Sequence, residues 1–333
     1  MPNLHILVSN AEEYTRLIES AQLPDLRITS SLEDCDIVLG EPKLIRDALP
    51  RLSSLKWTQS IYAGVETLMD PSLRRDYALT NARGVFGELM SEYVVGYLLA
   101  HEKKIFERYR AQQANQWDRF ASGWLRGKTL GLLGVGSIGA HLAGVAKAFG
   151  MKVWGYTRGS ETSTQVDRYF HPSSEESDGA TAPLSGQEQV SPSRASRDHS
   201  DAPTIQRFAA GLDYLVVILP RTDDTNKIVN ADLLNALPAH AILINVGRGN
   251  AVDESALVEA LNQNRIAGAI LDVTEQEPLP ENHPFWTTPN LLLTFHTSAI
   301  SYSEDIVKLF VENYHLYVQG KPLKYQVDFE RGY

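Results

Sequence analysis

The chain has 333 residues, enough for two domains that each bury a core, and its composition of 43% hydrophobic and 22% charged residues is that of a globular protein. The formal net charge of −10 argues against a nucleic-acid backbone or an anionic membrane as a partner. The single cysteine, Cys35, excludes an intramolecular disulfide and a multi-cysteine metal cluster.

The beginning of the chain shows none of the features of a signal peptide. A strand-like run at residues 4–8 follows Met1 almost directly, without a basic flank and a long apolar core. No apolar run reaches the roughly 18 residues of a membrane-spanning helix. We therefore expect a cytoplasmic protein in which Cys35 is a small buried residue, with neither a membrane nor a nucleic acid as partner.

Residues 1 to about 85 alternate short apolar runs with helical patterns, which predicts a parallel sheet covered by helices. Strands are expected at 4–9, 26–30, 36–39 and 56–60, and helices at 11–21, 42–49 and 65–69. The last strand leads into Ala63, Gly64 and Val65. A glycine turn at the carboxyl end of a parallel strand can offer backbone N–H groups to a ligand, although an ordinary turn is the alternative.

Two helical patterns are expected to connect two domains. Residues 88–113 predict one helix of about 25 residues, with apolar positions spaced for burial from Tyr93 to Tyr109. Residues 301–304 form a capping-box pattern that opens a helix to about Gln319 and leaves 320–333 as a tail. The chain would thus leave the first domain near residue 100 and return near 300, creating a cleft between the domains.

Residues 130–150 carry a G-x-G-x-x-G motif between two predicted strands, 130–133 and 152–156. The glycines allow a tight turn and let the backbone approach a pyrophosphate, and the helix that follows offers N–H groups to the phosphates. A glycine turn with a purely structural role is the alternative. The motif predicts a dinucleotide held by Gly134, Gly136, Ser137, Ile138 and Gly139.

The end of strand 152–156 carries information about which dinucleotide binds. Thr157 and Arg158 stand where an NAD-specific site would place an acid for the ribose 2′-hydroxyl, and no acid lies between Lys152 and Ser160. An arginine there can pair with a 2′-phosphate. We expect NADP(H) to be preferred, with NAD(H) as the alternative.

Residues 160–207 are expected to form a flexible, low-complexity insertion after this strand. Residues 172–204 are dominated by Ser, Pro, Glu, Asp, Gln, Ala and Gly, and their only large aliphatic residues are Leu184 and Val190. Such a segment cannot bury enough surface to offset the entropy of ordering it.

Polar residues follow three of the strands expected at 214–219, 241–246, 267–273 and 291–295, which alternate with helices at 231–237 and 253–263. They are Arg248, Asp272 with the nearby Glu277, and His296. Carboxyl ends of parallel strands lie at one edge of a sheet, so these residues could converge on a ligand. Singly, they could be a loop arginine, solvated acids and an interior histidine.

Together these residue types suit hydride transfer to a 2-oxo acid. Arg248 would hold the substrate carboxylate with its forked donors. His296 would protonate the carbonyl oxygen as hydride arrives, and Glu277 would orient the ring and raise its pKa.

The chain resembles the D-2-hydroxyacid dehydrogenase family, in particular its glyoxylate/hydroxypyruvate reductase branch. The likeness runs from about residue 55 to 320, with the family's order and approximate spacing at 134–139 (GVGSIG), 244–249 (INVGRG), 272–280 (DVTEQEPLP) and 293–298 (LTFHTS). It implies an α/β protein with two doubly wound parallel-sheet domains. These are a flavodoxin-like substrate-binding domain of residues 1–99 and 300–333 and a Rossmann NAD(P)-binding domain of residues 100–299.

The resemblance also implies a role for each candidate site residue. Arg248 matches the substrate-binding arginine, His296 the acid/base group and Glu277 its partner, and residues 63–65 match the loop that holds the substrate carboxylate. No metal is implied. Further cofactor contacts are implied for Pro220, Thr225, Val246, Gly247, Asp272 and Ser298.

The expected activity is NAD(P)H-dependent reduction of a small 2-oxo acid to the D alcohol by a homodimer joined through its cofactor domains. Phe295, Glu66 and Tyr62 replace residues common in the family and would change the pocket's shape. Formate oxidation is disfavoured, because that relative would have glutamine in place of Glu277. Two alternatives stay open: a dehydrogenase for larger 2-oxo acids, and a dinucleotide-sensing scaffold like the C-terminal-binding corepressors.

Overall fold

The computed structural model describes residues 1–159, 161, 163–172 and 204–332, which divide into two compact units. Unit 1 consists of Met1–Leu89, Pro220–Asp223 and Ala299–Tyr333, and unit 2 of Met90–Leu219 and Asp224–Ser298. The first division falls inside helix α3 (Gly87–Glu102), earlier than the boundary near residue 100 expected from the sequence. Each unit is an α/β domain around one parallel sheet, so the predicted fold class is confirmed.

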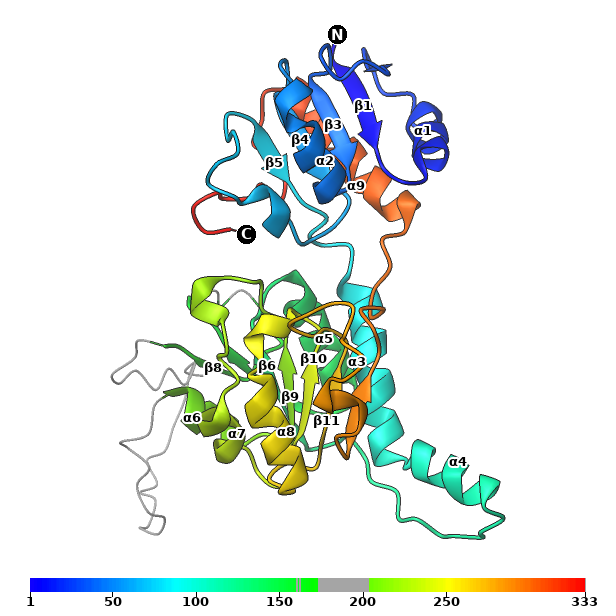
Figure 1. Cartoon of the computed structure of the whole chain (residues 1–333), viewed down its shortest axis with the longest axis vertical. Helices are drawn as coiled ribbons and strands as arrows, with labels where there is room; N and C mark the ends of the chain where they lie inside the picture. The colour runs from blue at the N-terminus through cyan, green and yellow to red at the C-terminus, as the bar shows by residue number, and fades with distance from the viewer. Residues whose placement is uncertain (160, 162, 173–203, 333) are drawn as a thin grey trace, which may run out of the picture. The chain divides into compact units, whose positions relative to one another are not determined.

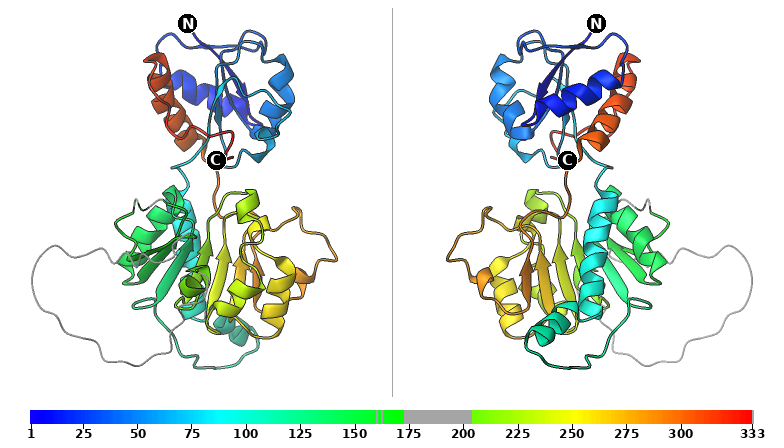
Figure 2. Two further views of the ribbon diagram at one scale, coloured as in Figure 1. Left: turned by 90° about the vertical axis from the view of Figure 1, so that its left-hand side faces the viewer. Right: turned by 90° about the vertical axis from the view of Figure 1, so that its right-hand side faces the viewer.

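Unit 1 has a five-stranded parallel sheet in the order β2-β1-β3-β4-β5, the flavodoxin-like order. Its strands are β1 (Asn3–Leu7), β2 (Arg27–Ile28), β3 (Ile37–Gly40), β4 (Trp57–Ser60) and β5 (Ala78–Thr80). Its helices are α1 (Ala11–Ser20), α2 (Pro42–Ala48) and α9 (Ser303–Val318), with short 3₁₀ turns η1 (Leu49–Arg51) and η2 (Glu66–Leu68). Helices α1 and α9 lie side by side, with α2 on the other side of the sheet (Figure 2).

The core of unit 1 is centred on Trp57 of β4, whose side chain is fully buried. Its ring stacks on Phe310 of α9 at 5.1 Å between centroids, and its Nε1 donates to Thr80 Oγ1 at 2.9 Å. The opposite face of the sheet buries Val38 against Ile45 of α2. Burial on both faces explains why these strands read as continuous apolar runs.

Two details at the end of the chain differ from the sequence-based prediction. The prediction of a capping box at residues 301–304 is wrong. The N-cap of α9 is Tyr302, whose side chain makes no capping hydrogen bond, and the Ser303 hydroxyl donates to Glu13 instead. Ser303 therefore bonds a residue far away in the chain and does not cap α9. The predicted tail docks onto the sheet, where Val327 is buried and its N–H donates to Leu79 O at 2.8 Å.

Unit 2 has a seven-stranded parallel sheet in the order β12-β11-β10-β9-β6-β7-β8, a Rossmann arrangement (Figure 1). Its strands are β6 (Thr129–Leu133), β7 (Lys152–Tyr156), β8 (Arg168–Phe170), β9 (Tyr214–Val217), β10 (Ile242–Asn245), β11 (Gly268–Leu271) and β12 (Leu291–Leu293). Besides α3, its helices are α4 (Ile105–Gln113), α5 (Ser137–Ala148), α6 (Thr204–Ala209), α7 (Ala231–Ala236) and α8 (Glu254–Asn262), and its 3₁₀ turns are η3 (Asp223–Thr225), η4 (Gly249–Ala251) and η5 (Pro284–Trp286).

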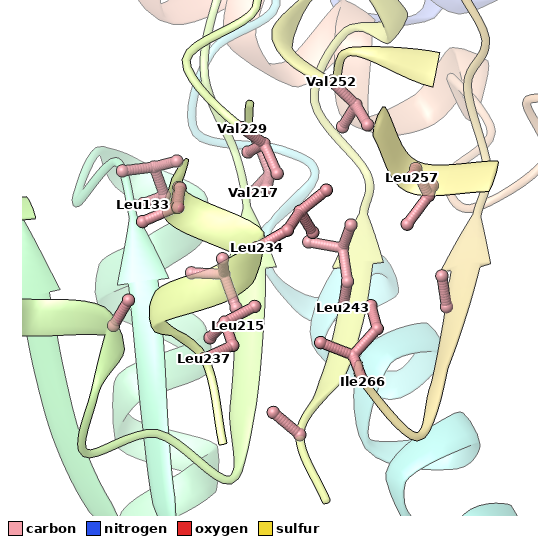
Figure 3. Close-up of a cluster of buried hydrophobic side chains, with 14 of the residues drawn as sticks. Leu133, Leu215, Val217, Val229, Leu234, Leu237, Leu243, Val252, Leu257 and Ile266 are labelled. Atoms are coloured by element: carbon pink, nitrogen blue, oxygen red, sulfur yellow. The ribbon is translucent and has the colours of Figure 1, made fainter. Parts of the chain in front are cut away.

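The two faces of this sheet bury alternate residues of each strand. Leu215 and Leu243 point to the core that α7 and α8 cover, which is shown in Figure 3. Tyr214 and Ile242, one residue earlier, belong to the core on the opposite face, with α3 and α5. This period of two fixes the register of the strands. Because all the strands are parallel, their carboxyl ends lie at one edge.

The prediction of one long helix over residues 88–113 is wrong. The chain forms α3 and α4, broken at Lys104, whose φ of 54° is left-handed. No glycine or proline marks the break. It coincides with tertiary contacts of the preceding turn, because Glu102 is buried and accepts hydrogen bonds from Tyr214 and Lys128. Tyr109, expected to be buried, is consequently 62% exposed.

The bounds predicted for the insertion, residues 160–207, include regular structure at both ends. Residues 168–170 form the edge strand β8, and α6 begins at Thr204, where Phe208 is fully buried. Residues 173–203 lie outside the described part of the chain, so the predicted flexibility there stays a prediction. In the described residues, no helix is both long enough and apolar enough to span a bilayer.

Candidate active site

The G-x-G-x-x-G turn connects β6 to α5, and two of its glycines are required by close packing. Gly134 has a φ of 102°, and a Cβ there would lie 2.8 Å from Ile218 O. A Cβ on Gly139 would lie 2.6 Å from Gly134 O. Side chains at these positions would push the helix off the strand.

Gly136, the N-cap of α5, has no such internal requirement. A Cβ there would meet no atom within 4 Å, so it would project into open space. The first turn of α5, with Ser137, Ile138 and Gly139, contains no acidic residue that would repel an anion. A pyrophosphate fits this cradle, because a glycine with open space beside it stands at a helix N-terminus, whose first N–H groups attract anions.

Thr157 and Arg158 follow β7, at the carboxyl edge of the sheet. The Arg158 guanidinium lies 2.5 Å from Asp224 Oδ2, and both side chains are at least half exposed. Pro220 follows β9, and Thr225 is buried at the end of η3. That these residues contact a dinucleotide stays a prediction from the sequence.

Arg248 stands in a tight loop after β10 that its own strand stabilises. Asn245, fully buried at the strand's last position, accepts from the N–H of Gly247 at 3.1 Å and donates to Arg248 O at 3.0 Å. The Arg248 guanidinium donates to Gly247 O at 2.8 Å. Val246, the first residue of the loop, is buried.

Gly249 couples this loop to the one that follows β11. A Cβ on Gly249 would collide with the carbonyl group of Thr274 and with the nitrogen of Glu275. Only glycine therefore allows the loop that carries Arg248 to pack directly on the loop that carries Glu277.

Glu277 and His296 form the central contact of the site. Glu277 Oε2 lies 2.7 Å from His296 Nδ1, and Glu277 Oε1 accepts from the N–H of Thr274 at 3.1 Å. Since an ionised carboxylate only accepts hydrogen bonds, Nδ1 carries a proton and Nε2 is the nitrogen available to a substrate. The His296 side chain is 53% exposed and the Glu277 side chain is 38% exposed.

The backbone that carries His296 is strained. Phe295 and His296 both have a φ of 57°, and two successive left-handed residues without glycine cost on the order of 1–2 kcal/mol each. Such a conformation persists only where its surroundings enforce it, and strain of this kind clusters at functional sites.

Asp272 enforces that conformation. Its carboxylate is 2% exposed and accepts from the N–H groups of Thr297 at 2.8 Å and Ser298 at 3.1 Å, and from Thr294 Oγ1 at 2.7 Å. Its carbonyl oxygen accepts from the N–H of His296 at 2.6 Å. The sequence predicted Asp272 and Ser298 as cofactor contacts. In the structure Asp272 follows β11, and Ser298 belongs to the loop that Asp272 holds.

A pocket of about 620 Å³ adjoins the Glu277–His296 pair. Glu277 and His296 line it together with apolar residues, and the rings of Trp286 and Phe295 stack 5.9 Å apart beside them. The other lining residues are Leu271, Asp272, Thr274, Pro278, Leu279 and Leu293.

The predicted substrate loop lies in unit 1. Ala63, Gly64 and Val65 lie in the turn that begins two residues after β4, and Ala63 O accepts from Asn81 Nδ2 at 2.9 Å, which stabilises the turn. Val65 is buried, whereas Tyr62 is 43% exposed.

Several residues of the site carry no signal in the sequence. Tyr93 on α3 bonds Thr294, far away in the chain, and Asp224 pairs with Arg158. Both contacts depend on tertiary register, which a single sequence does not reveal. Among the described residues, no group of three or more His, Cys, Asp or Glu side chains could hold a metal ion.

Comparisons with known proteins point to one enzyme family. The family model of the D-isomer specific 2-hydroxyacid dehydrogenase, NAD binding domain, matches residues 95–178 and 185–298 of the sequence. The glyoxylate/hydroxypyruvate reductase A of Yersinia enterocolitica is 29% identical over 286 residues, which cover 84% of this chain and 82% of that protein.

Solved structures match over almost the whole length. The crystal structure of a D-isomer specific 2-hydroxyacid dehydrogenase family protein from Aeromonas salmonicida is 36% identical, with a TM-score of 0.83, over 98% of this chain and 99% of that one. A D-isomer specific 2-hydroxyacid dehydrogenase from Xanthobacter autotrophicus, solved with NADPH and MES, is 28% identical with the same TM-score, over 100% and 99% of the two chains.

Proposed function

The chain belongs to the D-isomer specific 2-hydroxyacid dehydrogenase family, whose members are NAD(P)-dependent enzymes, and we propose that it reduces a small 2-oxo acid of the glyoxylate or hydroxypyruvate type to the D-2-hydroxy acid. The observation that carries the proposal is the 2.7 Å contact of Glu277 with His296 at the carboxyl edge of the Rossmann sheet.

The proposed chemistry divides among three side chains. When bound, the reduced nicotinamide supplies the hydride. His296 donates the proton on Nε2 to the substrate's carbonyl oxygen, and takes it back in the oxidation direction. Glu277 fixes the ring through Nδ1, so that Nε2 presents the proton. Arg248 binds the substrate carboxylate with two parallel donors, which also orients the carbonyl group.

We further propose that residues 63–65 supply backbone N–H groups to the same carboxylate. A turn beyond the carboxyl end of a parallel strand supports this role, because open α/β sheets bind ligands at that edge. On this proposal unit 1 is the substrate-binding domain and unit 2 the cofactor domain.

NADPH is the proposed reductant. Arg158 follows β7, no acid lies between Lys152 and Ser160, and a guanidinium suits the dianionic 2′-phosphate. The related Xanthobacter enzyme was crystallised with NADPH, which supports the same choice.

Steady-state oxidation of NADPH against a panel of 2-oxo acids tests the function. We expect turnover on glyoxylate or hydroxypyruvate, and His296→Ala should lower kcat by about 10²–10⁴-fold while the Kd for NADPH stays within twofold. Arg248→Lys should mainly raise KM for the acid, since one ammonium cannot replace the fork. Wild-type turnover in His296→Ala would contradict the acid/base role, and background rates on every acid would favour the dinucleotide-sensing scaffold.

A second candidate is a dehydrogenase for larger 2-oxo acids. It is supported by the pocket of about 620 Å³ beside His296, because Trp286, Phe295 and Leu279 give its wall an apolar surface that suits a larger apolar side chain on the substrate. A kcat/KM for phenylpyruvate above that for both small acids would decide for this alternative.

We also propose a homodimer. Exposed apolar side chains gather on α4 and on the chain that follows it, where Trp117 is 91% exposed. Such clusters mark protein interfaces.

A further inference from the structure

We propose that Tyr93 and Thr294 are positioning residues for the reaction, because they hold the Asp272 carboxylate that fixes the strained backbone of His296. The inference rests on the proposed function, since it takes His296 as the acid/base group. Neither residue touches the Glu277–His296 pair through a hydrogen bond in the described structure, so both act through Asp272.

The direction of the hydrogen bonds follows from the number of protons. Thr294 Oγ1 donates its only proton to Asp272 Oδ1 at 2.7 Å. It therefore accepts from the Tyr93 hydroxyl, which lies 2.5 Å away. Burial raises the pKa of Tyr93, so this hydroxyl keeps the proton that it donates.

Asp272 is the point where this chain of hydrogen bonds meets the catalytic loop. Its carboxylate holds the N–H groups of Thr297 and Ser298, directly after His296, and its carbonyl oxygen holds the N–H of His296 itself. With the carboxylate free to rotate, these anchors would loosen and the left-handed backbone at His296 would relax. The ring would then leave the position in which Glu277 orients it.

Tyr93 supplies a rigid reference for this loop. It lies on α3, which is fixed to the Rossmann sheet by the buried Val94 and Leu98. The hydroxyl thus ties a loop at the edge of the sheet to a helix that packs across its face. Tyr97, one turn later, contacts the Tyr93 ring edge-on at 4.8 Å, but its hydroxyl makes no hydrogen bond within the described part of the chain. It is therefore a matched control.

The test compares full-length Tyr93→Phe, Thr294→Val and Tyr97→Phe in NADPH-dependent reduction of the best 2-oxo acid. The first two should each lower kcat about tenfold, the effect of one hydrogen bond in a charged network, with the Kd for NADPH and the melting temperature nearly unchanged. Tyr97→Phe should match the wild type. Thr294→Ser, which keeps the hydroxyl, should recover most of the rate lost in Thr294→Val.

A double-variant cycle distinguishes positioning of His296 from a general structural role. Because Tyr93 acts through His296, Tyr93→Phe should not lower the residual rate of His296→Ala any further. An equal fold loss in both backgrounds, or wild-type kcat in Tyr93→Phe, would overturn the inference. If Tyr93→Phe does not fold, the contrast between Thr294→Val and Thr294→Ser decides in the same way. Full turnover in His296→Ala would instead overturn the proposed function, whatever Tyr93→Phe does.

Discussion

Arg158 lies in an ion pair with which a 2′-phosphate would have to compete. The Arg158–Asp224 contact is short, at 2.5 Å, but the two side chains are 50% and 72% exposed. An exposed pair of this kind contributes no more than about 1 kcal/mol, whereas a hydrogen bond to a charged group contributes about 1.5–3 kcal/mol. A doubly charged phosphate should therefore displace Asp224, which holds the guanidinium near the end of β7 until the cofactor binds.

Changes at these two residues should have opposite effects on cofactor affinity. Arg158→Ala should raise KM for NADPH about tenfold or more and leave KM for NADH within twofold, because only NADPH carries the 2′-phosphate. Asp224→Asn should lower KM for NADPH severalfold, because the competing carboxylate is gone. Asp223→Asn is the matched control. An equal or better kcat/KM with NADH in the wild type would contradict the proposed preference.

The positions of the proposed reacting residues were predictable because they follow from strand ends. Arg248 and His296 each come after an apolar strand, and parallel strands bring their carboxyl ends to one edge. Their support was not predictable. Nothing near Tyr93 in the sequence indicates Thr294 as its partner, and nothing before His296 indicates a left-handed backbone. These features depend on how helix, loop and sheet meet.

At the scale of elements, long apolar runs predicted strands well and tertiary contacts overrode local signals. Strand β7 begins and ends where the sequence indicated, whereas β5 and β8 are short edge strands without a clear pattern. The break between α3 and α4 is the clearest override, because no residue there favours it locally. The break directly follows the buried Glu102, which bonds Tyr214 and Lys128.

Lys104 should accordingly be a site where glycine stabilises the protein. Its φ of 54° and ψ of 42° are left-handed, a conformation that glycine adopts without steric cost. Lys104→Gly should raise the free energy of unfolding by up to about 1 kcal/mol, the steric relief exceeding the loss of its 3.8 Å ion pair with Glu107.

Thermal melts can be compared with those of Arg110→Gly, inside α4, which should destabilise by about 0.5–1 kcal/mol. Equal losses in the two variants would show that Lys104 is not strained.

At the scale of the whole molecule, two parallel-sheet units each have a core of their own. The chain passes from one unit to the other inside α3 and after Ser298, and the short segment Pro220–Asp223 also belongs to unit 1. This layout leaves α4 and the residues after it with no core to cover. They extend away from the sheet of unit 2 (Figure 1) and expose a run of apolar side chains. These are Ile105, Phe106, Tyr109, Trp117 and Trp124.

Five large apolar side chains within twenty residues are costly to keep in water, and a second copy of the chain can cover them. Light scattering after size exclusion should therefore give twice the 37.0 kDa mass of the chain. Tyr109→Glu combined with Trp117→Glu should give the monomer, because each would bury a charge in the interface. Val318→Glu, at an equally apolar and 45% exposed position on α9, should leave the dimer intact. A wild-type monomer at micromolar concentration would contradict the dimer. An unchanged mass in the double variant would instead remove α4 from the interface.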